Sequence, residues 1–87
     1  MYGELDPSNA LEDLRQELRL VAAKIRFKGG HQIVADEVRF SPEYIQQIRK
    51  GTNLLKNSSE NREFIKDLIS IYSKVHRDET IRMVKEL

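Results

Sequence analysis

The chain contains no cysteine and no tryptophan, and only two prolines and four glycines among its 87 residues. The lack of cysteine excludes disulfides, zinc sites built on thiolates and cysteine nucleophiles. No stretch approaches the ~18 consecutive apolar residues that a membrane-spanning helix requires. The first residues carry Glu4 and Asp6 without an apolar core, which argues against a secretory signal. We therefore expect a soluble, cytoplasmic protein.

The charged residues are almost balanced, with 15 basic and 14 acidic side chains, but they are unevenly distributed. Residues 1–23 hold two basic and five acidic side chains, residues 24–56 hold seven and three, and residues 57–87 hold six of each. A basic middle segment between acidic and neutral ends is typical of modest nucleic-acid binders. Hydrophobic residues make up 39% of the chain, enough for the core of a single small helical domain over residues 1–87.

Apolar residues recur at three- and four-residue steps along most of the chain, and no stretch alternates with a period of two for long enough to form a strand. This pattern predicts an all-α fold. The first amphipathic helix is expected over about 8–27, with Asp6 as its N-cap and Pro7 at its first position. The pair Gly29-Gly30 is expected to end it.

The segment from His31 to Gly51 contains two short predicted helices joined by a tight turn. The first of them runs to about Val38, and the second begins with Ser41 as its N-cap and Pro42 at its first position. Gly51 is suited to end the second helix, because glycine tolerates the left-handed conformation of a helix C-terminus. These features predict a helix-turn-helix at 31–51, a motif whose second helix enters the major groove of DNA.

The C-terminal third is predicted to be a helical extension over 60–87, capped by one of the residues Asn57, Ser58 and Ser59. Its last residues either continue this helix or form a short fifth helix. Leu54 or Leu55 is expected to pack on the core from the preceding loop. The buried stripe of the extension is expected to contain Phe64, Ile65, Leu68, Ile69, Tyr72 and Val75.

The two short helices resemble those of the DNA-binding domains of phage lambda-type repressors and Cro. In that family, Leu-Ala-x-x-x-Gly-Val-Ser is followed by a recognition helix with two spaced aliphatic residues and a closing Gly. This chain has Val34-Ala35-Asp36-Glu37-Val38-Arg39-Phe40-Ser41, then Ile45, Ile48 and Gly51 at the matching steps. The resemblance covers about residues 8–75 and implies a four- to five-helix lambda-repressor-like bundle. The chain departs from the pattern at the turn, where Arg39 replaces the common Gly and a positive φ would cost about 1 kcal/mol.

The predicted recognition helix packs inward through Ile45 and Ile48, which leaves Glu43, Gln46, Gln47 and Lys50 on its outer face. The resemblance implies base contacts by Pro42, Glu43, Tyr44 and Gln47. Gln47 is the strongest candidate, because an amide can pair with N6 and N7 of adenine. Phosphate contacts are expected from the end of this helix and from the start of the preceding one, at Arg49, Lys50, Lys28, His31 and Gln32. His31 aligns with a Gln that binds phosphate in several family members.

These features predict a sequence-specific DNA-binding transcriptional regulator that acts by occupancy, with no catalytic residue, no metal and no other cofactor. Because so small a module makes few contacts, we expect two copies on a pseudo-palindromic duplex. Ile81, Val84 and Leu87 either cover the end of the bundle or form the seam of a homodimer. The alternative function is a helical adaptor or antitoxin-like protein that keeps the fold but binds a protein partner, which Glu43, Arg39 and the small net charge favour.

Overall fold

The computed structural model describes residues 7–27, 29–52 and 55–86, which form four α-helices and contain no strand. The helices are α1 (Pro7–Ala23), α2 (Gly30–Val38), α3 (Pro42–Lys50) and α4 (Ser59–Glu86). The predicted all-α fold is confirmed. Within these ranges, no helix combines the length and the apolar character needed to cross a bilayer. Asp6, the predicted cap of the first helix, lies outside the described residues.

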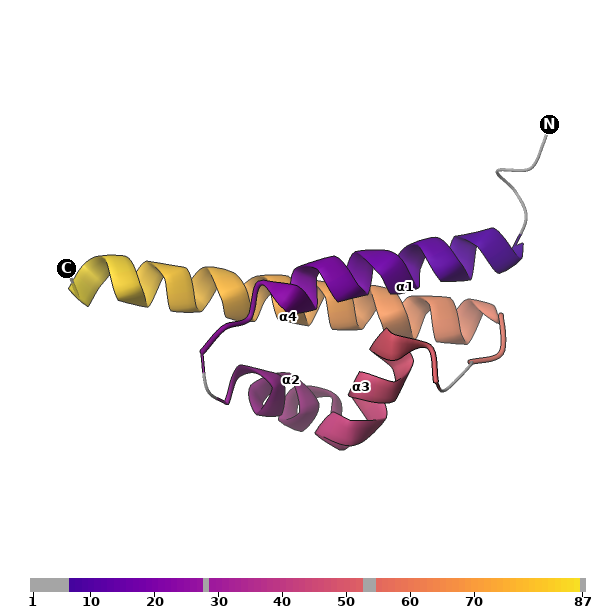
Figure 1. The fold of residues 1–87 in the computed structure, drawn as a ribbon, viewed down its shortest axis with the longest axis horizontal. Helices are drawn as coiled ribbons and strands as arrows, with labels where there is room; N and C mark the ends of the chain where they lie inside the picture. The colour runs from indigo at the N-terminus through magenta and orange to yellow at the C-terminus, as the bar shows by residue number, and fades with distance from the viewer. Residues whose placement is uncertain (1–6, 28, 53–54, 87) are drawn as a thin grey trace.

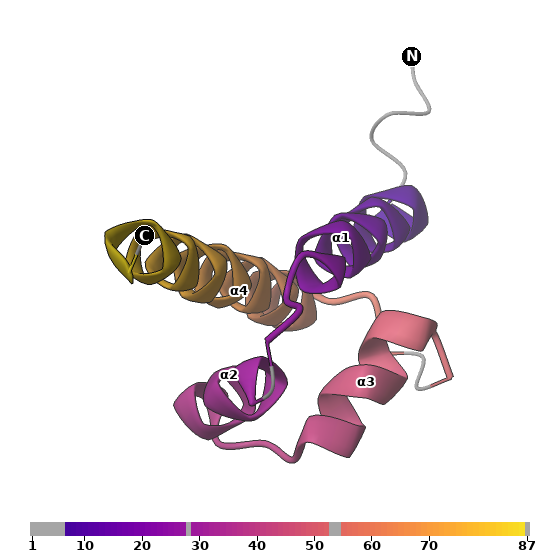
Figure 2. The ribbon, with the colours of Figure 1, turned by 60° about the vertical axis from the view of Figure 1, so that its left-hand side comes forward.

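The two long helices lie side by side, and the two short ones lie together on one side of this pair (Figure 1). α2 packs on α4, α3 packs on α1, and the two short helices contact each other. They are inclined to one another and joined by a short turn (Figure 2). α4 has 28 residues and α1 has 17, and at about 1.5 Å per residue α4 is longer by about 16 Å. The C-terminal part of α4 therefore extends past the end of α1 (Figure 1).

Every helix contributes to a single apolar core. Ile45 and Ile48 of α3 are each 1% exposed, as the sequence predicts for the inner face of that helix. Burial of a side chain of this size stabilises the fold by roughly 1.5–3 kcal/mol, so these two residues hold α3 firmly against the bundle. The other buried residues are Leu18, Ala22, Ile25, Val34, Ala35, Ile65, Leu68 and Tyr72.

The predicted end of the first helix is wrong. α1 ends at Ala23, and Gly30 begins α2 instead of ending α1. The amide of Ile25 donates to the carbonyl of Ala22 at 3.1 Å, in a tighter turn than an α-helix makes. By leaving the helix here, the chain buries Ile25 and packs Phe27 against the core. A Cβ on Gly30 would lie 2.3 Å from the Ile25 side chain, so the next helix starts at a residue that has none.

The C-terminal segment continues the fourth helix and does not form a fifth, because α4 is unbroken over Ser59–Glu86. Ser58 is its cap, since its Oγ accepts a hydrogen bond from the amide of Asn61 at 3.2 Å. Leu55 packs against the core, as one of the two leucines was expected to do. Leu54, the other, lies outside the described residues.

Candidate nucleic-acid interface

The turn between α2 and α3 has Arg39 in the left-handed conformation, with φ 64° and ψ 36°. Among the described residues, it is the one non-glycine residue with a positive φ. The amides of Arg39 and Phe40 both donate to the carbonyl of Ala35, Phe40 at 3.1 Å, as in a Schellman-type helix end. Arg39 therefore adopts the positive φ that the departure from glycine at this turn raised as a question. For a residue with a side chain, the steric cost of this conformation is about 1 kcal/mol.

The start of α3 is defined by two neighbouring residues, as the sequence predicts. The Oγ of Ser41 accepts a hydrogen bond from the amide of Tyr44 at 3.2 Å, and Pro42 occupies the first helical position. Glu43 lies in the first turn and Lys50 in the last turn, where their charges oppose the helix dipole. Part of the charge pattern of α3 thus stabilises the helix itself.

The outer face of α3 carries Glu43, Gln46, Gln47 and Lys50, all exposed. Of the four residues expected to contact bases, Glu43 and Gln47 are exposed, whereas Pro42 and Tyr44 are half-buried. The side chain of Gln47 is directed away from the core, since Ile45 and Ile48 occupy the opposite side of the helix. A polar face of this kind is available to a ligand along the length of α3.

Tyr44 takes part in an aromatic cluster that links the turn to α4. Its ring centroid lies 5.1 Å from that of Phe40, and the Phe40 ring meets Phe64 edge-on at 5.3 Å. Contacts between aromatic rings at such distances are favourable. The fold therefore uses the Tyr44 ring in this cluster, and the half-buried side chain is only partly available to another molecule.

His31 is tied to α4 at the N-terminal end of α2. Its Nδ1 lies 3.0 Å from the hydroxyl of Tyr72, and the two rings meet edge-on at 5.6 Å. Burial, and then the positive charge of Arg49, lower the pKa of His31. The ring is therefore neutral at pH 7 and brings no positive charge to a phosphate, which weakens the predicted role of His31. Burial also raises the pKa of the Tyr72 hydroxyl.

The other predicted phosphate contacts differ in their surroundings. Gln32 is exposed, and its amide donates to Asp36 Oδ1 at 2.7 Å. Arg49 is half-buried, and its Nε is fully buried without a hydrogen-bond partner among the described residues. The positive charge of Arg49 also contributes to the lowered pKa of His31. Lys50 is the exposed cation of this group, and Lys28 lies outside the described residues.

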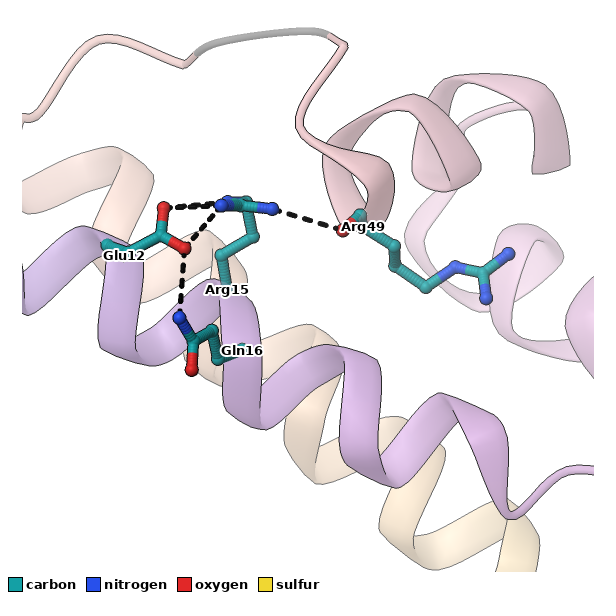
Figure 3. A network of polar contacts seen from close by, with 4 residues as sticks. All are labelled: Glu12, Arg15, Gln16 and Arg49. Atoms are coloured by element: carbon teal, nitrogen blue, oxygen red, sulfur yellow. Dashed lines mark hydrogen bonds and ion pairs between the residues drawn. The ribbon is translucent and has the colours of Figure 1, made fainter.

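A polar network from α1 holds the C-terminal end of α3 (Figure 3). Nη1 of Arg15 donates to the carbonyl of Arg49 at 3.4 Å. The carboxylate of Glu12 forms an ion pair with Arg15 and accepts a hydrogen bond from its Nε at 3.1 Å. Gln16 donates to the same carboxylate at 3.2 Å. The hydrogen bonds from Arg15 and then Gln16 lower the pKa of Glu12, which keeps the carboxylate charged.

The position of Arg15 suits the end of a helix. Its guanidinium lies where unpaired carbonyls and the negative end of the dipole of α3 attract a cation. Gly51, which ends α3 with φ 81°, leaves the space for it, since a Cβ there would lie 2.9 Å from Nη1 of Arg15. Sequence analysis missed this contact because the two partners are 34 residues apart and no local pattern connects them.

Comparison with known proteins finds no matching family model, no matching curated protein and no matching solved structure. Within the described ranges, no three histidine or acidic residues are grouped so that they would hold a metal ion. What can be said of function therefore comes from the residues of this chain alone.

Proposed function

We propose that this chain is a sequence-specific DNA-binding regulator, in which α2 and α3 form a lambda-repressor-like helix-turn-helix and α3 enters the major groove. The proposal rests on one observation. α3 is anchored through Ile45 and Ile48, which are buried, and leaves Gln46, Gln47 and Lys50 exposed on its outer face. Two amides beside a cation can pair with base edges and with the DNA backbone.

The rigidity of α3 also supports the proposal. Its first turn is capped by Ser41, and its last turn is held by Gly51 and by the guanidinium of Arg15. A helix fixed at both ends presents its side chains without further ordering, which lowers the entropic cost of binding. Gln47 pairs with adenine in this proposal, and Glu43 accepts a hydrogen bond from N4 of cytosine.

The phosphate contacts in this proposal come from exposed polar groups at the two helix ends. Lys50 supplies the charge, and the Gln32 amide exchanges its hydrogen bond with Asp36 for one with a phosphate oxygen. His31 contributes only through Nε2, since Nδ1 is bonded to Tyr72. Arg49, with its Nε buried, offers only the end of its guanidinium to a phosphate.

A second copy of the chain is the proposed protein partner on DNA. Ile81 and Val84 lie one helical turn apart on the projecting end of α4, and they are 47% and 63% exposed. In an antiparallel pair with Ile81 opposite Val84, Asp78 of one copy approaches Lys85 of the other, which favours self-association. Leu87, the third residue predicted for this seam, lies outside the described residues.

Selection from a random duplex library followed by sequencing of the bound pool tests the DNA-binding function. We expect an enriched motif and a steep loss of affinity with salt. Gln47→Ala relaxes the preference at one base position by about 1–3 kcal/mol. Lys50→Ala weakens binding to all sequences and lowers the salt slope by about one. Lys74→Ala, which removes an exposed lysine from α4, is the matched control and leaves the slope unchanged.

A folded protein that enriches no motif and binds no duplex at about 50 mM salt contradicts this function. That result favours the alternative, a helical adaptor or antitoxin-like protein. The observation on its side is the exposure of Ile81 and Val84 one helical turn apart on α4, because exposed apolar residues close together often mark a protein contact.

A further inference from the structure

A trough lies where α4 extends past the end of α1. It encloses about 660 Å³, within the range of about 300–1,000 Å³ that ligand pockets span. The described residues that line it come from two segments, 23–27 at the end of α1 and in the turn that follows, and 76–83 of α4. Between these two walls, the trough suits an elongated occupant better than a compact molecule.

The lining of the trough combines apolar residues, called its floor here, with cationic residues, called its rim. Ala23, Phe27 and Met83 form the floor, and Met83 is 58% exposed although it faces the same side of α4 as the core. Lys24 and Arg26 are exposed on the rim. The lining also includes Glu79, but its carboxylate is ion-paired with Arg82 at 2.7 Å. The unneutralised charge along the trough is therefore positive.

We propose that this trough binds an acidic amphipathic segment of a partner protein. Apolar side chains of the segment rest on Phe27 and Met83, and its carboxylates approach Lys24 and Arg26. An amphipathic helix laid in an apolar groove is a common mode of peptide recognition, and opposite charges at the rim add specificity. The trough is separate from the outer face of α3, so the interaction does not depend on DNA binding.

Two other occupants fit the trough less well. A duplex offers phosphates to the rim but has nothing to cover the exposed Met83. The projecting end of α4 from a second copy has three basic and three acidic residues over 77–86, so it offers no net negative charge to the cationic rim. Ile81 also lies about 200° around α4 from Met83, so the dimer seam and the trough are different surfaces.

A titration of the full chain with synthetic peptides, followed by amide chemical shifts in NMR, tests this inference. The probe is a capped peptide of about 15 residues, long enough to form a helix, with Leu and Phe at helical spacing and Glu and Asp elsewhere. One comparison peptide has Lys in place of every acidic residue, and another has Ala in place of every apolar residue. We expect the first peptide alone to bind, with shifts at residues 23–27 and 76–83.

Variants then locate the contact. Met83→Gln and Lys24→Glu each weaken the acidic peptide by about tenfold. The controls Leu20→Gln and Lys74→Glu alter exposed residues that do not line the trough, and they change the affinity by less than about twofold. All four changes are on the surface, and thermal unfolding followed by circular dichroism confirms that each variant is folded.

Equal binding of the lysine or the alanine peptide, shifts away from the trough, or no binding at about 1 mM peptide would overturn the inference. So would a random duplex that displaces the peptide with the same shifts, because Lys24 and Arg26 would then belong to the DNA interface. Self-association that shifts these same amides would assign the trough to a second copy and would also overturn it. Apart from the duplex competition, these titrations contain no DNA, so their results do not depend on whether α3 contacts bases.

Discussion

Replacing Arg39 with glycine is expected to stabilise the protein. Arg39 has φ 64°, where a residue with a Cβ is disfavoured by about 1–2 kcal/mol. Glycine removes this cost, but it also gives the unfolded chain more conformational freedom, which destabilises the folded state by about 0.4–1 kcal/mol. The Arg39 side chain is exposed, so its loss leaves no cavity. The net expectation is a gain of about 0.5–1 kcal/mol in the free energy of unfolding.

The assay is urea unfolding followed by circular dichroism, with Arg39→Ala as the matched control. Alanine also removes the side chain but keeps the Cβ, so we expect a change within about 0.5 kcal/mol. With an m-value of about 1 kcal/mol/M, Arg39→Gly raises the midpoint by about 0.5–1 M and leaves m unchanged. The melting temperature rises by about 2–8 °C. The strain argument is refuted if the glycine variant is no more stable than the alanine variant.

Three further changes test the packing around α3. Gly51→Ala is expected to destabilise the protein by about 0.5–1 kcal/mol in the same urea assay, because φ is 81° and the strain exceeds the conformational freedom that alanine removes from the unfolded chain. The new Cβ would also displace the end of the flexible Arg15 side chain, and an unchanged midpoint contradicts this account. Ile48→Ala is expected to cost about 2–5 kcal/mol, whereas a loss below about 1 kcal/mol would mean that α3 is not anchored there. Burial lowers the pKa of His31, so protonation of its ring favours the unfolded chain. The contribution of His31 to the free energy of unfolding is therefore fully present above its unfolded pKa of about 6.5, and it decreases as the pH falls below that value. His31→Gln is expected to make the free energy of unfolding fall less at low pH. If this free energy falls equally with pH in the variant and in the wild type, the account of His31 is wrong.

The helices of this protein follow from local features of its sequence. The bounds of α3, Pro42–Lys50, agree with the prediction because Ser41, Pro42 and Gly51 act through the backbone next to them. The exposure of Gln47 and Lys50 also follows from helix geometry once Ile45 and Ile48 are placed inward. Short-range rules of this kind need no knowledge of the rest of the fold.

The errors occur where distant segments meet. α1 ends at Ala23 because leaving the helix there lets Ile25 and Phe27 pack against the core. A periodic sequence pattern cannot compare the free energy of this burial with that of a longer helix. The burial of the Arg49 Nε depends on the fold in the same way, because residue type and position in α3 do not reveal it. Sequence analysis could not find the role of Arg15 because its partner lies on another helix.

Local features of the sequence therefore indicate most of the helical segments, the two ends of α3 and the residues of α3 that lie opposite the core. Contacts between distant segments bond His31 to Tyr72, place Arg15 at the end of α3, and form the trough between residues 23–27 and the projecting end of α4. The difference lies in the range of the interactions. Backbone hydrogen bonds and caps act within about four residues, whereas burial and side-chain pairing depend on residues that only the folded chain brings together.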